Sequence, residues 1–483
     1  MKMRVSKEAE KLCHVFDGHG DMYLVGGCVR DYFMGLENHD EDLTTPLTPD
    51  EIGGVLRQHG YPVIPVGAQF GTINTIVDGV QFEITTFRKE MGYTDGRHPD
   101  GVEYSRELLD DASRRDFTCN AMYYSMNRQE LIDPYNGLQD IEDGVLCAVG
   151  DASDRFQEDA LRMMRAVRIC TIKGFDMDDS VMQAIQENKS LIQKVSAERK
   201  FAELSKILMS DRPDVGFRLL DTSGLLQEVL PEVAALKACS QNSRYHGENV
   251  FDHTMRALSL SEGTDVVRWS VLLHDIGKVP CRMTDVTGID HFYGHPDVSK
   301  EMADVVLRRL RTSNEFRNDV LFCVGMHEQR YSKRLATKLT RLYVKNYRDV
   351  DLFERNKDAW FDVQKADILG QKGQIDVDMR LQNVENTRLA FAKLLSGPHR
   401  MEDLSVNGRD MMSAGMAPKE IPLMKAKLLH GLMLGQCVDR ESQLQYVYGN
   451  RKVVHEEYIV QNQKERRLPN VDVDGLSDSQ MSL

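Results

Sequence analysis

The sequence has no long apolar run and no paired cysteines. No stretch approaches the ~20 consecutive apolar residues of a membrane-spanning helix, and Met1-Lys2-Met3-Arg4 is not followed by the apolar core of a signal peptide. The 9 cysteines are scattered singly, without a Cys-x-x-Cys pair, which argues against a disulfide framework or a zinc knuckle. We therefore expect a cytoplasmic protein with reduced thiols and no membrane contact.

Positive charge is also scarce. The 483 residues include 61 Lys and Arg against 75 Asp and Glu, a formal net charge of -14. Nonspecific coating of nucleic acid needs a dense basic surface, so any RNA contact must be local. The basic segment from Lys333 to Arg348 is one candidate, and a solvated helix face is the alternative. A chain of this length is expected to divide into several domains.

The hydrophobic pattern changes along the chain. Residues 61–66, 72–77 and 80–87 are predicted strands, the last two joined by a turn at Asp78-Gly79. A polar segment with several glycines, from Arg88 to Tyr104, is predicted to be a mobile loop. From about Phe156 the pattern is helical almost to the end, and we see no internal repeat. This order predicts a mixed head followed by helical domains.

Two carboxylates, Asp40 and Asp42, follow an apolar stretch that breaks at Gly26-Gly27. Alternate residues of a strand share a face, so these carboxylates could hold divalent cations between them, as transfer of a nucleotidyl group requires. A solvated acidic turn is the alternative. The glycines would let the backbone approach a polyphosphate, with the following helix N-terminus and Arg30 directed at the anion.

Further polar groups follow in the same region. Glu83 could be a third carboxylate of the metal site, or a solvated residue on a strand face. Arg115, Asp116 and Asn120 combine a guanidinium with acceptors that suit phosphate and ribose oxygens. A helix N-terminus with surface arginines is the alternative here.

Residues Asp159 to Arg168 are predicted to form one helix. A spacing of three places Asp159, Arg162, Arg165 and Arg168 along one side. An aspartate beside an arginine offers an acceptor next to donors, which complements the amino group and ring nitrogen shared by cytosine and adenine. An exposed, salt-bridged helix is the alternative. Farther on, Ser196 is a predicted helix cap, followed by a Glu198-Arg199 pair.

These segments resemble the successive motifs of the class II tRNA nucleotidyltransferases, the family of CCA-adding enzymes and bacterial poly(A) polymerases. The motifs are Leu24 to Asp31, Asp40 to Asp42, Arg114 to Met122, Asp133 to Gly137 and Glu158 to Arg162. Glu41, Thr44 and Cys119 depart from the residues usual in the family, and none of these departures removes a catalytic group.

The resemblance implies a role for each candidate. Asp40 and Asp42 would be catalytic and would hold Mg²⁺ in the head. The residues implied to bind the nucleotide are Gly26, Gly27 and Arg30 at the phosphates, Arg115, Asp116 and Asn120 at sugar and phosphate, and Asp159, Arg162, Arg165 and Arg168 at the base.

A second constellation consists of histidines and aspartates. His246, His253, His295 and His327 are spread around the adjacent pair His274-Asp275, and Asp367 follows later. The run Leu273 to Lys278 resembles the HD metal-dependent phosphohydrolases. That resemblance implies a metal site of His253, His274, Asp275 and Asp367, binding Mg²⁺ or a divalent transition metal that activates water, although such a fold can also persist as a scaffold.

The predicted fold class is α+β, with a head like that of polymerase beta, a mixed sheet with helices, followed by all-helical neck, HD and tail domains. The expected domains are the head at 1–150, the neck at 151–235, the HD domain at 236–375, a helical body contacting tRNA at 376–462, and a disordered tail at 463–483. We expect an Mg-dependent enzyme that adds CCA, or only its terminal A, to tRNA from CTP and ATP. The alternatives are a poly(A) polymerase and an HD phosphohydrolase whose head only binds nucleotide.

Overall fold

The computed structural model describes residues 3–37, 41–68, 71–91, 101–242, 248–328, 335–345, 350–372 and 376–465. The chain splits into two compact units, one of Met1–His327 with Asp362–Ile375 and the other of Glu328–Phe361 with Asp376–Leu483. Asp40, His246, Lys333, Arg334 and Arg348 lie outside the described residues, as does most of the predicted mobile loop.

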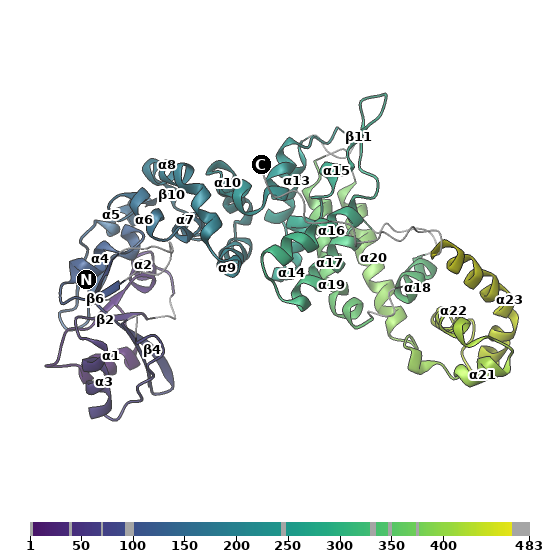
Figure 1. Cartoon of the computed structure of the whole chain (residues 1–483), viewed down its shortest axis with the longest axis horizontal. Coiled ribbons are helices and arrows are strands. Elements are labelled where there is room, and N and C mark those ends of the chain that lie inside the picture. The colour runs from purple at the N-terminus through teal and green to yellow at the C-terminus, as the bar shows by residue number, and fades with distance from the viewer. Residues whose placement is uncertain are drawn as a thin grey trace, which may run out of the picture. The chain divides into compact units, whose positions relative to one another are not determined.

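The predicted α+β fold class is confirmed: strands gather in the N-terminal part of the chain and helices dominate afterwards (Figure 1). The strands of the main sheet are β1 Tyr23–Val25, β2 Leu43–Thr45, β3 Thr72–Val77, β4 Val80–Thr86, β7 Tyr123–Ser125 and β8 Glu130–Ile132. The short pairs are β5 Arg88–Met91 with β6 Gly101–Tyr104, β9 Val145–Leu146 with β10 Asp176–Met177, and β11 Met283–Thr284 with β12 Asp290–His291.

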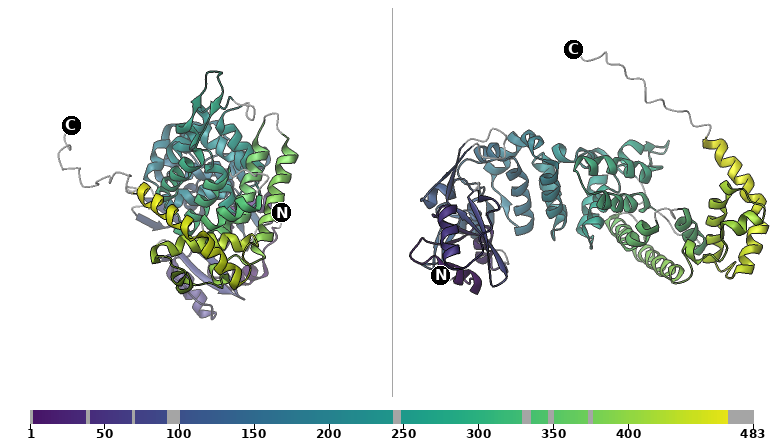
Figure 2. Two further views of the ribbon diagram at one scale, coloured as in Figure 1. Left: turned by 90° about the vertical axis from the view of Figure 1, so that its right-hand side faces the viewer. Right: turned by 60° about the horizontal axis from the view of Figure 1, so that its bottom comes forward.

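The helices of the head are α1 Lys7–Val15, α2 Gly27–Phe33, α3 Pro49–Gln58, α4 Leu108–Ser113, η2 Thr118–Asn120 and α5 Gly137–Asp143. Those of the neck are α6 Ala152–Glu158, α7 Leu161–Lys173, α8 Asp179–Asn188, η3 Lys189–Lys194, α9 Ala197–Leu208, α10 Pro213–Thr222, α11 Leu225–Val229, α12 Pro231–Ala234 and η4 Ala235–Ala238. Next come α13 Val250–Ser259, α14 Asp265–Leu273, α15 Lys278–Cys281, α16 His295–Arg309, α17 Asn314–Met326 and α19 Val350–Gly370. The second unit also contains α18 Leu335–Lys345, α20 Val377–Leu395, η6 Met401–Asp403, α21 Gly408–Ser413, η7 Pro418–Glu420, α22 Ile421–Met433 and α23 Arg440–Glu465 (Figure 2).

The main sheet has the strand order β3-β4-β2-β1-β7-β8 and is mixed, because β2 and β4 pair in parallel. Asp78 and Gly79 both have positive φ, 49° and 89°, which suits the tight turn between β3 and β4. Alternation separates the two faces of the sheet. Leu24 and Tyr124 join the larger core with α1 and α3, whereas Tyr23 and Tyr123 join a smaller cluster that includes Ala112 of α4.

Three sequence-based expectations are wrong in this part. Residues 61–66 form no strand, and only Ile64 makes an isolated bridge, to Asn74. Pro62 and Pro65 cannot donate to a ladder, which explains the break. The ends of the predicted mobile loop form the β5–β6 hairpin, with Arg88 opposite Tyr104. Helix α23 continues past residue 463 to Glu465, and residues 466–483 of the predicted tail lie outside the described part.

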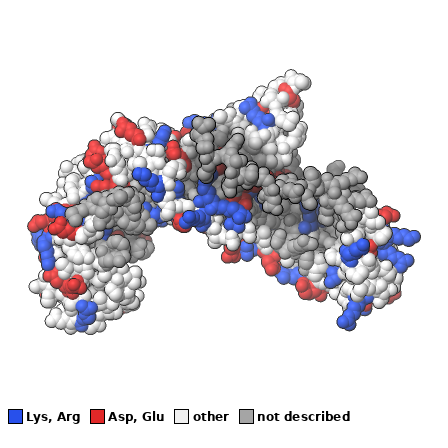
Figure 3. All heavy atoms as spheres, viewed as in Figure 1, with Lys and Arg blue, Asp and Glu red and all other residues white. Residues whose placement is uncertain are grey.

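No described helix is both long and apolar enough to cross a membrane. All 9 cysteines are free, as the scattered spacing predicted. On the face seen in Figure 3, basic and acidic side chains are interspersed among the described residues rather than gathered into one basic surface. This distribution agrees with the expectation that any RNA contact would be local.

Candidate nucleotidyl-transfer site and metal centre

The paired glycines connect β1 to α2. Gly26 has φ +79° and forms the N-cap of α2, and a Cβ there would lie 3.5 Å from Nη1 of Arg115. A side chain at Gly26 would therefore be strained and would crowd the arginine. One turn later, Arg30 Nη1 donates to Asn120 Oδ1 at 2.6 Å. The turn thus joins the first motif of the sequence to the third.

Asp42 lies directly before β2, so the expectation that it belongs to a strand is wrong by one residue. Its carbonyl oxygen still accepts from the Val25 amide at 3.1 Å, which continues the pairing with β1. Leu43 pairs with Ile84 in the parallel register, so Asp42 neighbours Glu83. Burial and the charge of Asp42 raise the pKa of Glu83, while Arg88 opposes the shift. Two carboxylates are thereby held close together.

A cavity of about 390 Å³ opens at these carboxylates. Its basic side chains are those of Arg88, Arg114 and Arg115. A second cavity, of about 1040 Å³, also reaches Asp42 and Glu83 but extends beside the N-terminal segment. Guanidinium groups facing carboxylates across one cavity suit a polyphosphate together with a cation, because each charged partner is matched.

A buried aspartate, Asp111, holds the arginine pair, and the sequence offered no signal for it. Its carboxylate pairs with Arg114 at 2.5 Å and Arg115 at 3.0 Å, and it accepts from the Tyr123 hydroxyl at 2.7 Å. Burial would raise the pKa of Asp111, but the two guanidiniums lower it to about 2. The alternative of a surface arginine pair is wrong, because both arginines pair with this buried, ionised carboxylate and are themselves mostly covered.

Asp116 links the head to the neck helix α7. Its Oδ2 accepts from Arg165 Nε at 2.7 Å, and its Oδ1 accepts from Asn120 Nδ2 at 3.1 Å. Because Asn120 also accepts a hydrogen bond from Arg30, a continuous polar network runs from α2 through Asn120 and Asp116 to α7. Burial would raise the pKa of Asp116, yet Arg165 and Arg162 lower it to about 2. The carboxylate therefore remains ionised at neutral pH.

The predicted helix from Asp159 to Arg168 is wrong at its beginning. Asp159 ends α6 with extended backbone, at φ −141° and ψ 104°, and α7 begins at Leu161. The Asp159 Oδ1 accepts from the Leu161 amide at 3.0 Å, the local hydrogen bond by which an aspartate starts a helix rather than continues one. Arg162, Arg165 and Arg168 do follow one half-buried side of α7, as the spacing predicted.

Each of these polar groups already has an intramolecular partner. Arg162 contacts Glu158 at 2.5 Å and the Arg114 carbonyl at 2.9 Å. Arg199 of α9 makes a fork to Asp159, at 2.7 Å to Oδ2 and 3.3 Å to Oδ1. Recognition of a base by Asp159 must therefore share the carboxylate with Arg199 or displace it.

Helix α9 supports α7 through ion pairs that differ from the expected ones. Ser196 is the N-cap but makes no side-chain capping bond, and Arg199 pairs with Asp159 instead of Glu198. The reason is direction: Glu198 is exposed and pairs with Arg311, whereas Arg199 points at Asp159, at the end of α6. Arg168 donates to the buried Glu203 at 2.6 Å.

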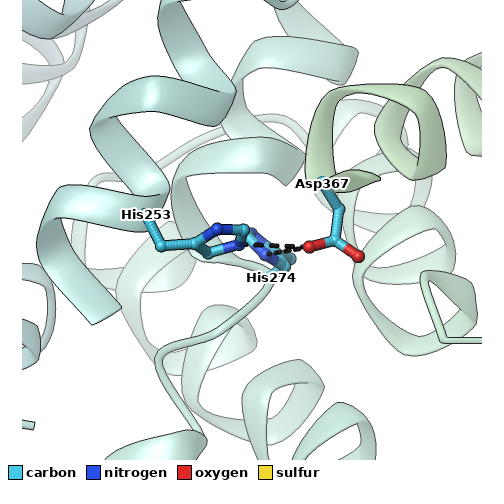
Figure 4. Close-up of side chains that lie close together, drawn as sticks. All are labelled: His253, His274 and Asp367. Atoms are coloured by element: carbon cyan, nitrogen blue, oxygen red, sulfur yellow. Dashed lines mark ion pairs between the residues drawn. The ribbon is translucent and has the colours of Figure 1, made fainter. Parts of the chain in front are cut away.

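The histidine and aspartate constellation converges in the first unit. Figure 4 shows the side chains of His253, His274 and Asp367 pointing toward one another from different helices. Nε2 of His253 lies 3.1 Å from Asp367 Oδ1, and Nε2 of His274 lies 3.1 Å from Asp275 Oδ2. All four residues of the implied ligand set are thus brought together.

His295 and His327 extend the cluster, although they were not included in the implied ligand set. Their Nε2 atoms lie 3.2 Å apart, and that of His295 lies 3.3 Å from Asp275 Oδ1. The six side chains form two groups of ligand spacing: His253, His274 and Asp367, and then Asp275, His295 and His327. The signal in the sequence was the series of histidines around His274-Asp275. Their spacing alone cannot show that the segments carrying them meet in the fold.

The chemistry of the donor set fits divalent metal ions. In each of the four histidines, Nδ1 lies 2.7 to 3.1 Å from a backbone carbonyl oxygen. The pairs are His253 with Gly370, His274 with Val271, His295 with Phe292 and His327 with Val324. Carbonyls only accept, so Nδ1 of each ring carries a proton and Nε2 is the nitrogen turned toward the cluster, as in metal-binding histidines.

Protonation of the cluster follows from burial and neighbouring charge. Burial and the nearby His274 lower the pKa of His327 to about 3. Burial alone would lower the pKa of His274, but the carboxylates of Asp275 and Asp367 raise it to about 10. Nε2 of His274 and both oxygens of Asp275 are buried and make no hydrogen bond of good geometry within the described structure, lying only at ion-pair distances. A cation would satisfy these atoms.

The head and the helices after it resemble those of nucleotidyltransferases with a helical neck. Residues 22–147 match the family described as "Poly A polymerase head domain", and residues 174–237 match "Probable RNA and SrmB- binding site of polymerase A". These matches confirm, for the head and neck, the resemblance to the class II tRNA nucleotidyltransferase and poly(A) polymerase family that the motifs predicted.

Individual relatives agree. The chain is 42% identical over 218 residues to a CCA-adding enzyme of Lactiplantibacillus plantarum, which covers 45% of this chain and 52% of that protein. The chain therefore spans about half the length of the curated relatives it matches. The fold is similar to that of the Bacillus stearothermophilus CCA-adding enzyme solved with CTP, with a TM-score of 0.64 and 23% identity over 95% of this chain and 98% of the other. The Thermotoga maritima CCA-adding enzyme solved with tRNA gives 0.53 and 18% over 92% and 96%.

Proposed function

We propose that this protein adds CCA, or its terminal A, to tRNA 3′ ends from CTP and ATP. The observation that carries the proposal is the cavity in which Asp42 and Glu83 face Arg88, Arg114 and Arg115, in a head similar to that of CCA-adding enzymes. The alternatives are a poly(A) polymerase and an HD phosphohydrolase whose head only binds nucleotide. The relatives reported above are CCA-adding enzymes, which favours addition to tRNA.

In this proposal Asp42, with Asp40 and Glu83, would hold Mg²⁺. A bound Mg²⁺ neutralises charge on the triphosphate and stabilises in-line attack by the tRNA 3′-hydroxyl, with release of pyrophosphate. Arg114 and Arg115 bind the phosphates, held in place by Asp111. The turn at Gly26 and Gly27 lets the backbone approach the same phosphates.

The base would be recognised by Asp159 at the end of α6 and Arg162 in the first turn of α7. Asp159 accepts from the amino group that cytosine and adenine share, and Arg162 donates to the adjacent ring nitrogen. Arg165 and Arg168 hold α7 against Asp116 and Glu203, so their role is to position the helix.

One assay tests the proposed activity. The full chain is incubated with Mg²⁺, a tRNA that lacks its 3′ end and radiolabelled CTP, followed by ATP, and the products are resolved on a sequencing gel. Ordered addition of C, C and A is the expected result. Addition of A only to a tRNA that already ends in CC would identify the A-adding form, long A tails would identify a poly(A) polymerase, and no extension would overturn the proposal.

A second function is favoured by the six-residue metal cluster. We propose that the HD-like part hydrolyses a phosphate ester, with the first group of ligands and the second each able to hold one divalent ion. A bound ion supplies a nucleophilic water at neutral pH. Elemental analysis of the purified protein, followed by phosphodiesterase assays with Mn²⁺, Ni²⁺ or Mg²⁺, tests this function separately from nucleotide addition.

A further inference from the structure

A buried amide beside the metal cluster has an unused donor. Gln241 is 3% exposed, and its Oε1 accepts from Lys278 Nζ at 2.9 Å. An ammonium group can only donate, so this contact identifies which end of the amide is oxygen. Within the described part of the chain, the other end, Nε2, is buried and has no hydrogen-bond partner. An unsatisfied buried N–H is costly, so a natural protein that retains one has a reason for it.

Lys278 connects this amide to the cluster. Its Nζ lies 2.7 Å from Asp275 Oδ2 as well as against Gln241, and the lysine is itself 6% exposed. Lys278 also lies 5.5 Å from the centre of the Phe292 ring, which packs it from another side. The Lys278 ammonium therefore bridges the Asp275 carboxylate and the Gln241 amide. Nε2 is the second donor of this group, on the far end of the same amide.

We propose that Gln241 Nε2 and Lys278 Nζ bind the phosphate oxygens of the substrate hydrolysed at the metal cluster. This inference rests on the proposed hydrolase function of that site. A phosphate group offers only acceptors, and the two side chains, joined through Gln241 Oε1, both offer donors. Gln241 is thus a substrate-binding residue, and the substrate class is a phosphate ester whose non-bridging oxygens reach the amide.

Substitution of Gln241 by glutamate isolates the donor. Gln241→Glu keeps the oxygen that receives Lys278 and the shape of the side chain, but replaces the N–H donor by an acceptor that repels phosphate. Gln241→Met removes both ends with little change in volume. Gln443→Glu is the matched control, because Gln443 is another buried amide whose Oε1 accepts hydrogen bonds and whose Nε2 has no partner among the described residues. It belongs to the second unit and to no described metal cluster.

The measurement is calorimetric titration of inorganic phosphate into the full Mn²⁺-loaded chain, after metal content has been determined. His274→Ala serves as the blank that subtracts phosphate bound elsewhere. We expect both Gln241 variants to retain metal and to bind phosphate about tenfold or more weakly, since a charge-assisted hydrogen bond is lost, and Gln443→Glu to bind like the original chain.

Unchanged phosphate affinity in both Gln241 variants would show that the amide only anchors Lys278. Loss of metal in both would show that it supports the metal ligands, which also overturns the inference. If the unsubstituted chain holds no metal or gives no phosphate signal above the blank, the hydrolase proposal itself fails, and this inference fails with it.

Discussion

Asp42 is the described carboxylate on which nucleotide addition depends most directly in our proposal. It shares the cavity with Glu83 and three guanidiniums, and its side chain is exposed. A carboxylate in this position contributes through charge held near the phosphates rather than through stability.

We therefore expect Asp42→Ala to abolish nucleotide addition while tRNA affinity stays within a few-fold. Single-turnover extension and a filter-binding titration measure the two quantities. Asp154→Ala, at an exposed position in the first turn of α6, is the control and should extend tRNA normally. Turnover in Asp42→Ala comparable to that of the control would refute the metal assignment.

The carboxylate of Asp159 is already paired with a protein group, the guanidinium of Arg199. Uracil and guanine present a carbonyl where cytosine and adenine present an amino group, so the Asp159 carboxylate should repel them. We expect Asp159→Ala to lower the preference for CTP over UTP by at least about tenfold, which corresponds to roughly 1–3 kcal/mol.

The measurement is kcat/KM under single-turnover conditions for all four nucleotides. Arg199→Ala is informative as a companion, since it removes the partner of Asp159 but keeps the carboxylate, and should retain the CTP preference. Arg162→Ala should instead reduce the use of CTP and ATP together. Unaltered CTP:UTP and ATP:GTP ratios in Asp159→Ala would show that the base is recognised elsewhere.

At the scale of elements, α7 is the helix that organises the candidate site. Its buried face includes Met163, Met164 and Val167, and its polar side is held by separate carboxylates through Arg165 and Arg168. The Arg168–Glu203 pair is the more secluded anchor, because Glu203 is only 5% exposed. Removing one partner of such a pair leaves a charge without compensation in a poorly solvated place.

We expect Arg168→Met to lower the free energy of unfolding by about 3 kcal/mol, and Arg168→Met combined with Glu203→Leu to recover most of that loss. The midpoint of urea unfolding, followed by circular dichroism of the helices, measures both. Arg308→Met removes an exposed i,i+4 pair with Asp304 and should cost less than about 1 kcal/mol. Equal losses in the single and double variants would mean that packing, and not the ion pair, secures α7.

At the scale of the whole molecule, the two proposed chemistries would draw on different segments of the chain. The head cavity is lined by residues between Val25 and Arg115, whereas the metal cluster is built from residues between His253 and Asp367. The expected domain limits remain predictions; the structure adds that α19 runs from the second unit into the first and carries Asp367 there.

Separate sites predict separable activities. We expect His274→Ala to abolish metal-dependent cleavage of 2′,3′-cyclic or 2′-phosphates and to leave nucleotide addition unchanged, because independent sites contribute additively. The reverse should hold for Asp42→Ala. The bound metal is then removed by chelation, and Mn²⁺, Ni²⁺ or Mg²⁺ is added back. If none of these ions restores the phosphodiesterase activity, or if the purified chain binds no metal, this part of the chain is a scaffold.

Local rules account for much of what could be predicted. The β3–β4 hairpin follows from alternation and the Asp78-Gly79 turn, and the arginine side of α7 follows from a spacing of three, since these features act within a few residues. The errors have local causes too: the prolines at 62 and 65 interrupt pairing, and the hydrogen bond between Asp159 and Leu161 starts a helix where continuity was expected.

The residues themselves determined the motif order, the fold class and the family resemblance, because dihedral preference, periodicity and side-chain chemistry are properties of short segments. Only the tertiary structure decided that Glu83 neighbours Asp42 and that Asp111 holds two arginines. It also decided that Arg199 forms an ion pair with Asp159, and that His295 and His327 join the metal cluster. Strand order and helix packing bring these groups together, and no spacing along one chain specifies which distant partner a buried charge will find.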